Sequence, residues 1–205
     1  FSKARSDNDW LIYNLEAAQE SLAGIVEQAQ LGRFSRLIIR DGRLDMNDAL
    51  YGLLRTFNGI SLDVTPGTDG VSAKGTFQAT FGGQRMVGNI ERTADPDGTV
   101  RLRADITNFD FSSFMPFIND ADAISGVEGT GALSMDVHYS AEGKVLDAVF
   151  RVDMTGTELR LLEDRFPIAT SIIKVAWKPD AARFDMEPAE ITVGKSGGTV
   201  SGTFV

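Results

Sequence analysis

Four carboxylates beside predicted turns are the residues of this sequence that could do acid–base chemistry: Asp45, Asp48, Glu163 and Asp164. Paired carboxylates act as general acid and base, or as acid and nucleophile, in glycoside hydrolysis. Here the four fall at equivalent places of two similar passages, at the ends of strand-like segments. Acidic residues in such places usually serve solubility, so we expect no catalytic pair.

Two further patterns suggest metal or phosphate binding. Asn119, Asp120 and Asp122 cluster hard oxygen ligands of the kind that Ca²⁺ prefers, but their spacing matches no standard calcium loop, and no metal is expected. Residues 194–196 (Gly-Lys-Ser) resemble the end of a phosphate-binding loop. Ala189 stands where that pattern requires Gly, and no helix pattern follows. We therefore predict a hairpin over 194–196.

Nucleophilic and thiolate chemistry finds little support. The chain has no Cys, which excludes disulfides, thiolate nucleophiles and Cys-ligated zinc. The one His, His138, lies on the polar side of a predicted strand, where an exposed or hydrogen-bonded ring is expected. No Ser has a neighbouring base that the sequence reveals. The sequence thus predicts no enzyme and no cofactor.

Composition limits the classes of partner. The 205 residues carry a formal net charge of −9, which argues against nucleic acid, because nucleic acid requires clustered Lys and Arg. With 42% hydrophobic residues the chain can bury a core or one face of a long sheet. No run of 18 apolar residues exists. The chain starts at Phe1 without Met, and we interpret it as a piece of a longer protein whose anchor lies elsewhere.

The elements that must position these residues are one helix and many strands. Apolar residues at spacings of three and four predict a helix over 7–31, ended by Gly32. From residue 36 onward the apolar period is two, which predicts eleven or twelve short strands with one wet and one apolar face. Residues 36–40 form the first of these, with a hairpin at Asp41-Gly42. We divide the chain into a helix packed on the sheet (1–35) and one continuous β unit (36–205).

A loose internal repeat supports a sheet built from local pieces. Residues 42–77 contain GRLDMND, ISLDVTP and VSAKGTF; residues 157–204 contain TELRLLED, IKVAWKP and TVSGTF, with an extra strand pair over 183–193.

One segment does not follow the alternation of apolar and polar residues. Residues 109–118 (FDFSSFMPFI) are rich in large apolar side chains. Phe111, Phe114, Met115 and Phe117 are candidates for a plug or a lipid contact; the alternative is a crossover that fills the sheet edge.

Several of these pieces together resemble the periplasmic part of AsmA-like envelope proteins, in particular the YhdP-type branch. The resemblance rests on IIRDGRLDMND with ISLDVTP, on ITNFDFSSFMPFI ahead of a Gly-rich bend, on GALSMDVHYSAEGKVLDAVF and on TVGKSGGTVSGTF. It covers about residues 36–205. It implies a mainly β fold: an elongated, twisted antiparallel sheet curved into a U-shaped groove with an apolar inner face, here with one N-terminal α-helix.

The resemblance also implies a function. Such a segment binds phospholipid acyl chains in its groove and supports lipid transport between the inner and outer membranes. It would lie in the periplasm of a Gram-negative bacterium, in a protein anchored in the inner membrane. Its partners would be neighbouring segments of the same protein and components of both membranes. The alternative that the residues leave open is a closed β-sandwich, a structural or interaction module of the envelope without lipid transport.

A groove of this kind would be lined by apolar residues from successive strands, because acyl chains need no directional polar contacts. The alternating strands supply twelve candidates: Leu62, Phe77, Phe81, Leu102, Ile106, Leu133, Met135, Val137, Phe150, Val152, Val175 and Trp177. For each of them taken alone, ordinary core packing is the simpler interpretation.

Overall fold

Strict alternation of apolar and polar residues gives strands along most of the chain in the computed structural model. The structure describes residues 16, 19–20, 23–24, 27–28, 31–48, 53–66, 72–81, 84–112, 124–161 and 164–204. Within these ranges the protein is mainly β and forms an open antiparallel sheet, as predicted.

The described residues form twelve strands and one short 3-10 helix, in agreement with the eleven or twelve strands expected. They are β1 (Leu37–Asp48), β2 (Leu53–Pro66), β3 (Ala73–Phe81), β4 (Gln84–Ala94), β5 (Val100–Asp110), β6 (Ile124–Glu128), β7 (Thr130–Tyr139), β8 (Val145–Asp153), β9 (Glu158–Leu161), β10 (Asp164–Lys178), η2 (Pro179–Ala181), β11 (Arg183–Val193) and β12 (Ser196–Phe204).

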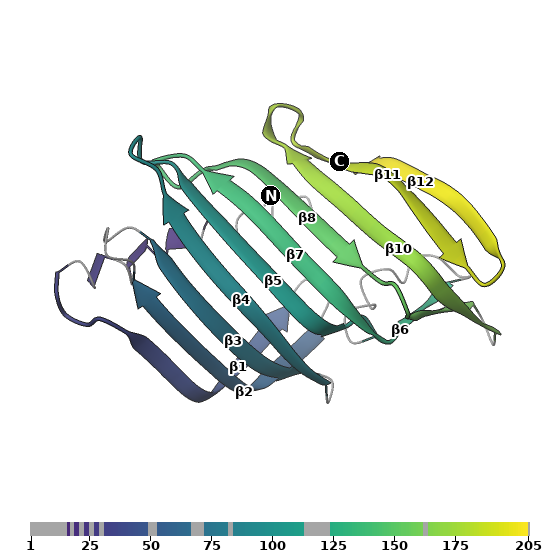
Figure 1. The fold of residues 1–205 in the computed structure, drawn as a ribbon, viewed down its shortest axis with the longest axis horizontal. Helices are drawn as coiled ribbons and strands as arrows, with labels where there is room; N and C mark the ends of the chain where they lie inside the picture. Colours follow the sequence, from purple (N-terminus) through teal and green to yellow (C-terminus); the bar gives the residue numbers. More distant parts are fainter. Residues whose placement is uncertain are drawn as a thin grey trace, which may run out of the picture.

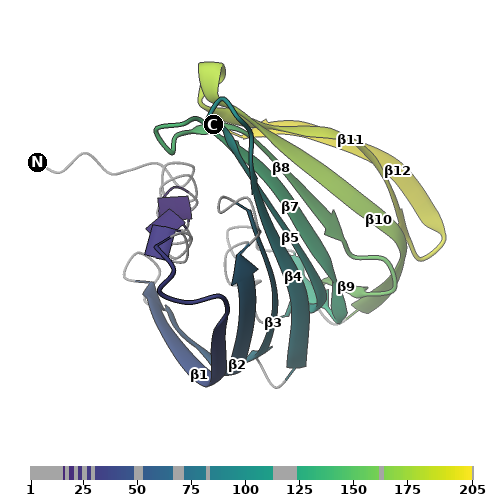
Figure 2. The same ribbon diagram turned by 60° about the vertical axis from the view of Figure 1, so that its left-hand side comes forward.

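Ten of the strands lie side by side in the order β1-β2-β3-β4-β5-β7-β8-β10-β11-β12 (Figure 1). Neighbouring strands pair antiparallel, and chain order departs from sheet order only where β6 and β9 are passed over. These two strands pair with each other, and β9 pairs with the first residues of β10, Asp164–Pro167. The sheet is curved, and the described helical positions of the N-terminal region lie on its inner side (Figure 2).

Local turn chemistry explains two of the connections within the described ranges. The loop over Asp95 to Gly98 is closed by a hydrogen bond from the Gly98 N–H to the Asp95 carbonyl (2.9 Å), and Gly98 has φ +88°. Residues 194–195 join β11 to β12 with Gly194 at φ +60°, so the Gly-Lys-Ser sequence is the predicted hairpin.

The hairpin predicted at Asp41-Gly42 is wrong. Both residues lie inside β1, at register shifts opposite β2, and Asp41 has φ +53°.

The N-terminal helix predicted over 7–31 lies largely outside the described residues. The described positions between 16 and 28 are helical, but the described part of the chain holds no continuous helix of seven or more residues. Gly32 ends this segment as expected. It has φ +70°, and the Arg33 N–H donates to the Gln28 carbonyl (3.2 Å), the six-to-one bond of a Schellman motif.

The two similar passages occupy different surroundings. The first runs along three adjacent strands, β1, β2 and β3, whereas the second runs along β9, β10 and β12. The extra strand pair expected over 183–193 is a single strand, β11, which lies between β10 and β12. The similarity therefore reflects equivalent strand patterns and not two copies of one spatial unit.

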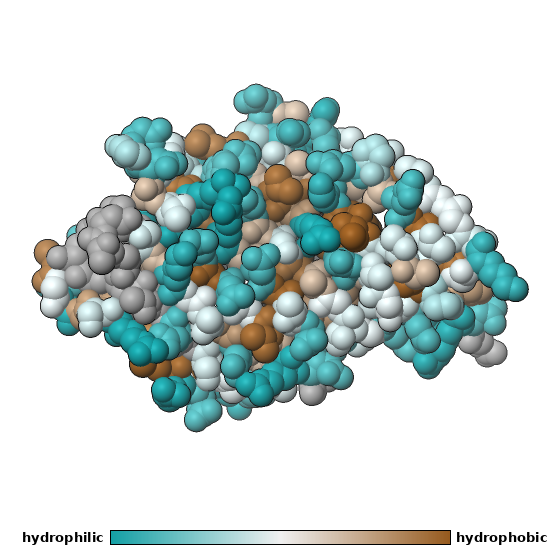
Figure 3. Space-filling view, in the orientation of Figure 1, coloured by the Kyte–Doolittle hydropathy of each residue, from teal (hydrophilic) through white to brown (hydrophobic). Residues whose placement is uncertain are grey.

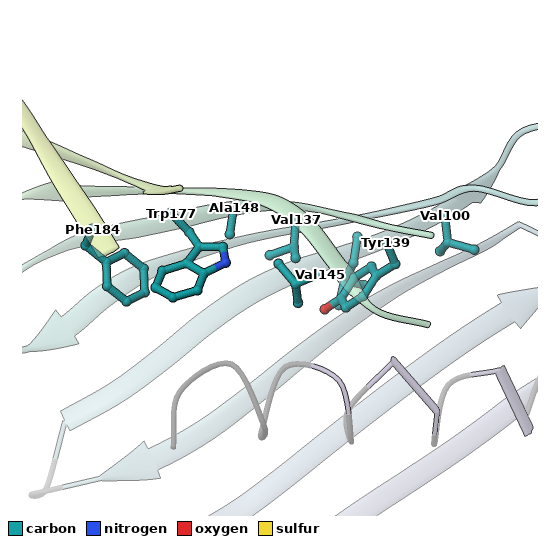
Figure 4. Close-up of a cluster of buried hydrophobic side chains, with 8 residues drawn as sticks. Val100, Val137, Tyr139, Val145, Ala148, Trp177 and Phe184 are labelled. Atoms are coloured by element: carbon teal, nitrogen blue, oxygen red, sulfur yellow. The ribbon is translucent and has the colours of Figure 1, made fainter. Parts of the chain in front are cut away.

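The main apolar cluster lies on the inner side of the sheet. Its buried members project to one side from β5, β7, β8, β10 and β11 (Figure 4); they are Val100, Leu102, Val137, Tyr139, Val145, Ala148, Trp177 and Phe184. Smaller clusters continue it in both directions. One contains Ala79 and Met86, and the other contains Phe111, Val127 and Ile168.

Candidate functional site

Cross-strand register gathers the predicted groove residues on one face of the sheet, here called the inner face. Opposite residues in neighbouring strands point to the same side, and each strand alternates sides with period two. The pairs that link the candidates are Leu62↔Phe77, Phe77↔Gly88, Gly88↔Ile106, Ile106↔Leu133, Leu102↔Val137, Leu133↔Val152, Met135↔Phe150, Phe150↔Val175, Val137↔Ala148 and Ala148↔Trp177. Phe81 lies four residues after Phe77 in β3 and shares its side by alternation. Eleven of the twelve positions thus lie in three parallel rows of pairs on one face of the sheet, and Phe81 lies beyond these rows on β3; the role of all twelve in lipid binding stays a prediction.

The inner face is covered most completely at its centre. Among the ten candidates whose side chains are described, Leu102 and Val137 are 2% and 0% exposed, and Trp177 is also buried. The other seven are half-buried: Phe77, Ile106, Leu133, Met135, Phe150, Val152 and Val175. The candidate residues at the centre of the inner face are therefore buried from solvent, whereas those at its flanks remain partly exposed to solvent.

Two described residues of the N-terminal region hold polar contacts at this centre. Glu16 accepts a hydrogen bond from Lys144 Nζ (3.0 Å) and another from the Val145 N–H (3.4 Å) at the start of β8. Gln19, 7% exposed, accepts one from Arg92 Nε of β4 (3.3 Å). Each contact joins residues more than 70 positions apart in the sequence, so Glu16 and Gln19 cover part of the inner face.

Burial at this centre perturbs two ionisable groups. Loss of water lowers the pKa of the Arg92 guanidinium, which lies in the apolar row opposite Leu102. Burial, and to a smaller degree the negative charge of Glu16, raises the pKa of the Tyr139 hydroxyl well above its usual value. The raised pKa keeps the Tyr139 hydroxyl protonated at neutral pH, so it is not poised as a general base.

The opposite, outer face is hydrophilic with scattered apolar side chains (Figure 3). Its centre is a ladder of charges across β5, β7 and β8. Arg101 Nε donates to Asp136 Oδ1 (2.6 Å), and Arg103 Nε donates to Asp136 Oδ2 (3.2 Å). His138 follows, with Nδ1 3.0 Å from Asp147 Oδ2 and Nε2 3.7 Å from Asp136 Oδ1. Carboxylates face both nitrogens of this ring, an arrangement that orients the histidine and stabilises the ladder.

The ladder predicts a pH dependence of stability that is carried by Asp136. Its hydrogen bond from Arg101 holds the pKa of the Asp136 carboxyl below the ordinary value of 3.8. A lowered pKa means that this group stabilises the fold fully above about pH 4 and loses that contribution as the pH falls through the lower folded-state pKa. We therefore expect Asp136→Asn to destabilise the protein at about pH 7 by more than it does at about pH 3.

Urea unfolding at these two pH values measures the effect. Asp105→Asn is the matched control, because Asp105 is an exposed carboxylate on the same face of the neighbouring strand β5. If Asp136→Asn costs the same free energy of unfolding at both pH values, the ion pair with Arg101 contributes nothing to stability in solution.

The carboxylates weighed for catalysis do not come together. Asp45 lies in β1, where it contacts Arg43 (Nε–Oδ2 3.0 Å), while Asp164 begins β10, and six strands of the sheet lie between β1 and β10. Asp48 ends β1 and Glu163 lies outside the described residues. The described carboxylates of this set therefore do not form the acid–base pair that glycoside hydrolysis requires.

The remaining candidates fall largely outside the described ranges. Asn119, Asp120 and Asp122 lie there, as do Phe114, Met115 and Phe117. Phe111 is described and 7% exposed; its ring packs edge-on against Phe109 with centroids 5.2 Å apart. It contributes to the cluster with Val127 and Ile168, as an element that fills the sheet would.

Comparison with known proteins identifies no relative: no protein-family model, no curated protein and no solved structure matches this chain. Over the ranges that the structure describes, no helix has the length and apolar character to cross a membrane. The same residues contain no group of three or more His, Cys, Asp or Glu side chains arranged to hold a metal ion.

Two features of the site escaped sequence reasoning. The pairing of His138 with Asp147 follows from the β7–β8 hairpin, whose turn at Glu142-Gly143 was visible in the sequence, so counting outward from it would have found the pair. The sequence indicates the placement of Arg92 on the apolar side more weakly. Arg92 follows Met86 and Ile90 at even spacing along β4, so alternation puts it on the same side as these apolar residues.

Proposed function

We propose that the inner face binds the acyl chains of phospholipids and that the chain is a segment of an AsmA-like periplasmic bridge between the inner and outer membranes. The observation that carries the proposal is the set of apolar residues that β2, β3, β5, β7, β8 and β10 place on one face of an open sheet whose other face is charged; β4, between β3 and β5, adds Met86 and Ile90 to this face but also Gly88 and Arg92. In this proposal the curvature of the sheet forms a U-shaped groove around the lipid.

The energetics of such a surface suit transport. Burying one methylene group stabilises a bound chain by about 0.8 kcal/mol, so a long acyl chain binds without any directional contact. Many similar sites along successive strands allow the chain to move without crossing one deep minimum. The half-buried residues Phe77, Leu133 and Phe150 occupy the flanks, where an acyl chain would enter.

Burial at the centre of the same face favours a second candidate, a structural or interaction module of the cell envelope. Val137 and Ala148 are 0% exposed, which is typical of a permanent core. The described strands do not form the two facing sheets of the closed β-sandwich expected for this alternative, because ten of them follow one another in a single sheet. As a module, the protein would cover one sheet face with other parts of its own chain.

Lipid co-purification separates the two candidates. We expect the protein, expressed in the periplasm of a Gram-negative bacterium, to carry phospholipid that native mass spectrometry and lipid extraction detect. Leu133→Asp, a charge on the inner face, should abolish this binding, because burying an unpaired carboxylate beside an acyl chain is costly. Leu133→Gln is the milder variant if the first one fails to fold.

Val87→Asp is the matched control. Val87 is 36% exposed on the outer face, opposite Gln78 and Thr107, so the same change from an apolar residue to a charge leaves the inner face intact. A lipid-free, cooperatively folded wild-type protein would contradict lipid binding and favour the module. Equal lipid loss in both variants would show that the lipid does not occupy the inner face.

A further inference from the structure

The most deeply buried part of the inner face lies under a second layer of the chain. Val137 and Tyr139 of β7 and Ala148 of β8 are 0% exposed, although their strands belong to one sheet. A side chain on the face of a single sheet keeps contact with water unless another segment lies over it. The described helical residues between 16 and 28 lie on this side of the sheet (Figure 2), and we call them the N-terminal cover.

The N-terminal cover turns one side to water and another side to the sheet. Glu20, Gly24 and Glu27 are exposed and follow one another at spacings of four and three, which places them on one side of a helix. Gln19, the residue before Glu20, is buried. The cover therefore packs on the inner face with the side that carries Gln19.

Three hydrogen bonds attach the cover to two strands of the sheet. Arg92 Nε of β4 donates to the side-chain oxygen of Gln19 (3.3 Å). Lys144 Nζ and the Val145 N–H, at the start of β8, donate to the carboxylate of Glu16 (3.0 and 3.4 Å). In the sheet, β5 and β7 lie between β4 and β8. The contacts therefore hold the cover across β5 and β7.

We propose that the N-terminal cover competes with an acyl chain for the centre of the inner face, so that it closes the lipid site until it is displaced. This inference rests on the proposed function. Leu102 of β5 and Val137 of β7 are paired candidate groove residues, and both lie between the two sets of contacts. An acyl chain that enters at the half-buried flanks can extend across β5 and β7 only after the cover has left.

The contacts of Glu16 suit a cover that can leave. The Lys144 side chain is 72% exposed, and an ion pair so close to water contributes little to stability. When the cover leaves, water replaces the hydrogen bonds of Glu16 and Lys144 at little cost. The apolar residues beneath are then free to bury an acyl chain in place of the cover.

Thiol reactivity measures the opening without any lipid. The chain has no Cys, so Val137→Cys introduces a single thiol at a buried position beneath the cover. In lipid-free protein a maleimide should modify this thiol slowly. Glu16→Ala combined with Gln19→Ala, here called the anchor variant, should raise the rate by about tenfold or more, because a buried group reacts only from the open state. Glu20→Ala removes a carboxylate from the exposed side of the cover and should leave the rate unchanged.

Two other valines provide matched reporters. Val149→Cys lies exposed on the outer face, opposite Asp136, and should react fast with or without the anchors. Val127→Cys lies buried in the cluster with Phe111 and Ile168 and should stay slow in both backgrounds. Faster modification of Val127→Cys would reveal that the anchor variant unfolds, and Gln19→Ala alone would then replace it.

Lipid uptake tests the competition itself. Delipidated protein is incubated with vesicles of phosphatidylethanolamine and phosphatidylglycerol, and native mass spectrometry counts the lipid that stays bound. We expect the anchor variant to bind lipid with about tenfold higher apparent affinity than the wild type, because apparent affinity scales with the fraction of molecules that are open. Glu20→Ala should match the wild type.

Three results would overturn the proposal. Equal modification of Val137→Cys with and without the anchors would show that Glu16 and Gln19 do not hold a cover. Equal lipid uptake by the anchor variant and the wild type would leave lipid binding intact and exclude competition. An anchor variant that opens but takes up no lipid would instead contradict the proposed function, and the cover would be a purely structural layer.

Discussion

Replacement of Trp177 by Ala is expected to lower the free energy of unfolding by about 3–5 kcal/mol. Trp177 is 8% exposed at the centre of the inner face, and its ring lies against Phe184 with centroids 4.8 Å apart. Phe184 in turn contacts Phe150 edge-on, with centroids 6.1 Å apart. Removing the indole leaves a cavity between three strands and withdraws one aromatic partner from this chain of contacts.

Urea unfolding followed by circular dichroism measures the loss. Lys178→Ala is the control, because Lys178 is the next residue of β10 and points to the exposed side. Trp177→Phe keeps an aromatic ring in place and should cost less than Trp177→Ala. A loss below about 1 kcal/mol for Trp177→Ala would mean that this side of the sheet is not packed as a core in solution. That result would strengthen the proposal of an accessible lipid surface.

Replacement of Gly131 by Ala is expected to destabilise the protein by about 3 kcal/mol, at the upper end of the cost of overpacking. A Cβ atom at Gly131 would lie 2.1 Å from the Asp153 carbonyl oxygen and 2.6 Å from Phe111 Cε2. The first contact is with backbone, which cannot rotate away, so β7 and β8 would have to separate where Ala132 pairs with Asp153. The strain would reach the cluster that contains Phe111.

Gly198→Ala is the matched control for this prediction. Gly198 also lies in a strand, and nothing stands within 4 Å of the Cβ that the change would add. We expect its stability to stay within about 0.5 kcal/mol of the wild type, measured by the same urea unfolding. If the two variants behave alike, the close approach at Gly131 is not maintained in solution.

Alternation along single strands was sufficient to assign faces. The apolar residues of β5 and β7 were predicted to share a side, and the pairs Leu102↔Val137 and Ile106↔Leu133 confirm it. The turn predicted over 194–196 was found for a similar reason, since Gly194 adopts a positive φ between β11 and β12. Both signals are local: they depend on a few residues and on a side-chain period that every strand shares.

The wrong hairpin prediction at Asp41-Gly42 shows what a local sequence pattern cannot predict. The dipeptide is typical of a hairpin, but in the structure it is a bulge inside β1, because pairing with β2 on both sides of Gly42 keeps the strand extended. The pairing partner is up to 27 residues away, between Leu37 and Val64, and no local pattern specifies it. Long-range pairing therefore decided between two conformations that the dipeptide allows equally.

The sequence by itself determined the strands, their apolar and polar sides, most turns and the absence of thiol chemistry. Only the tertiary structure decided that β6 and β9 leave the main order, that Arg92 meets Gln19, and that Glu16 reaches the start of β8. The tertiary structure also decided which side chains of the inner face are buried from solvent. The reason is physical. The alternation of side chains between the two faces follows from the backbone geometry of a single strand. Which strands pair, and which segments cover the inner face, depends on which distant segments bury the most apolar surface together.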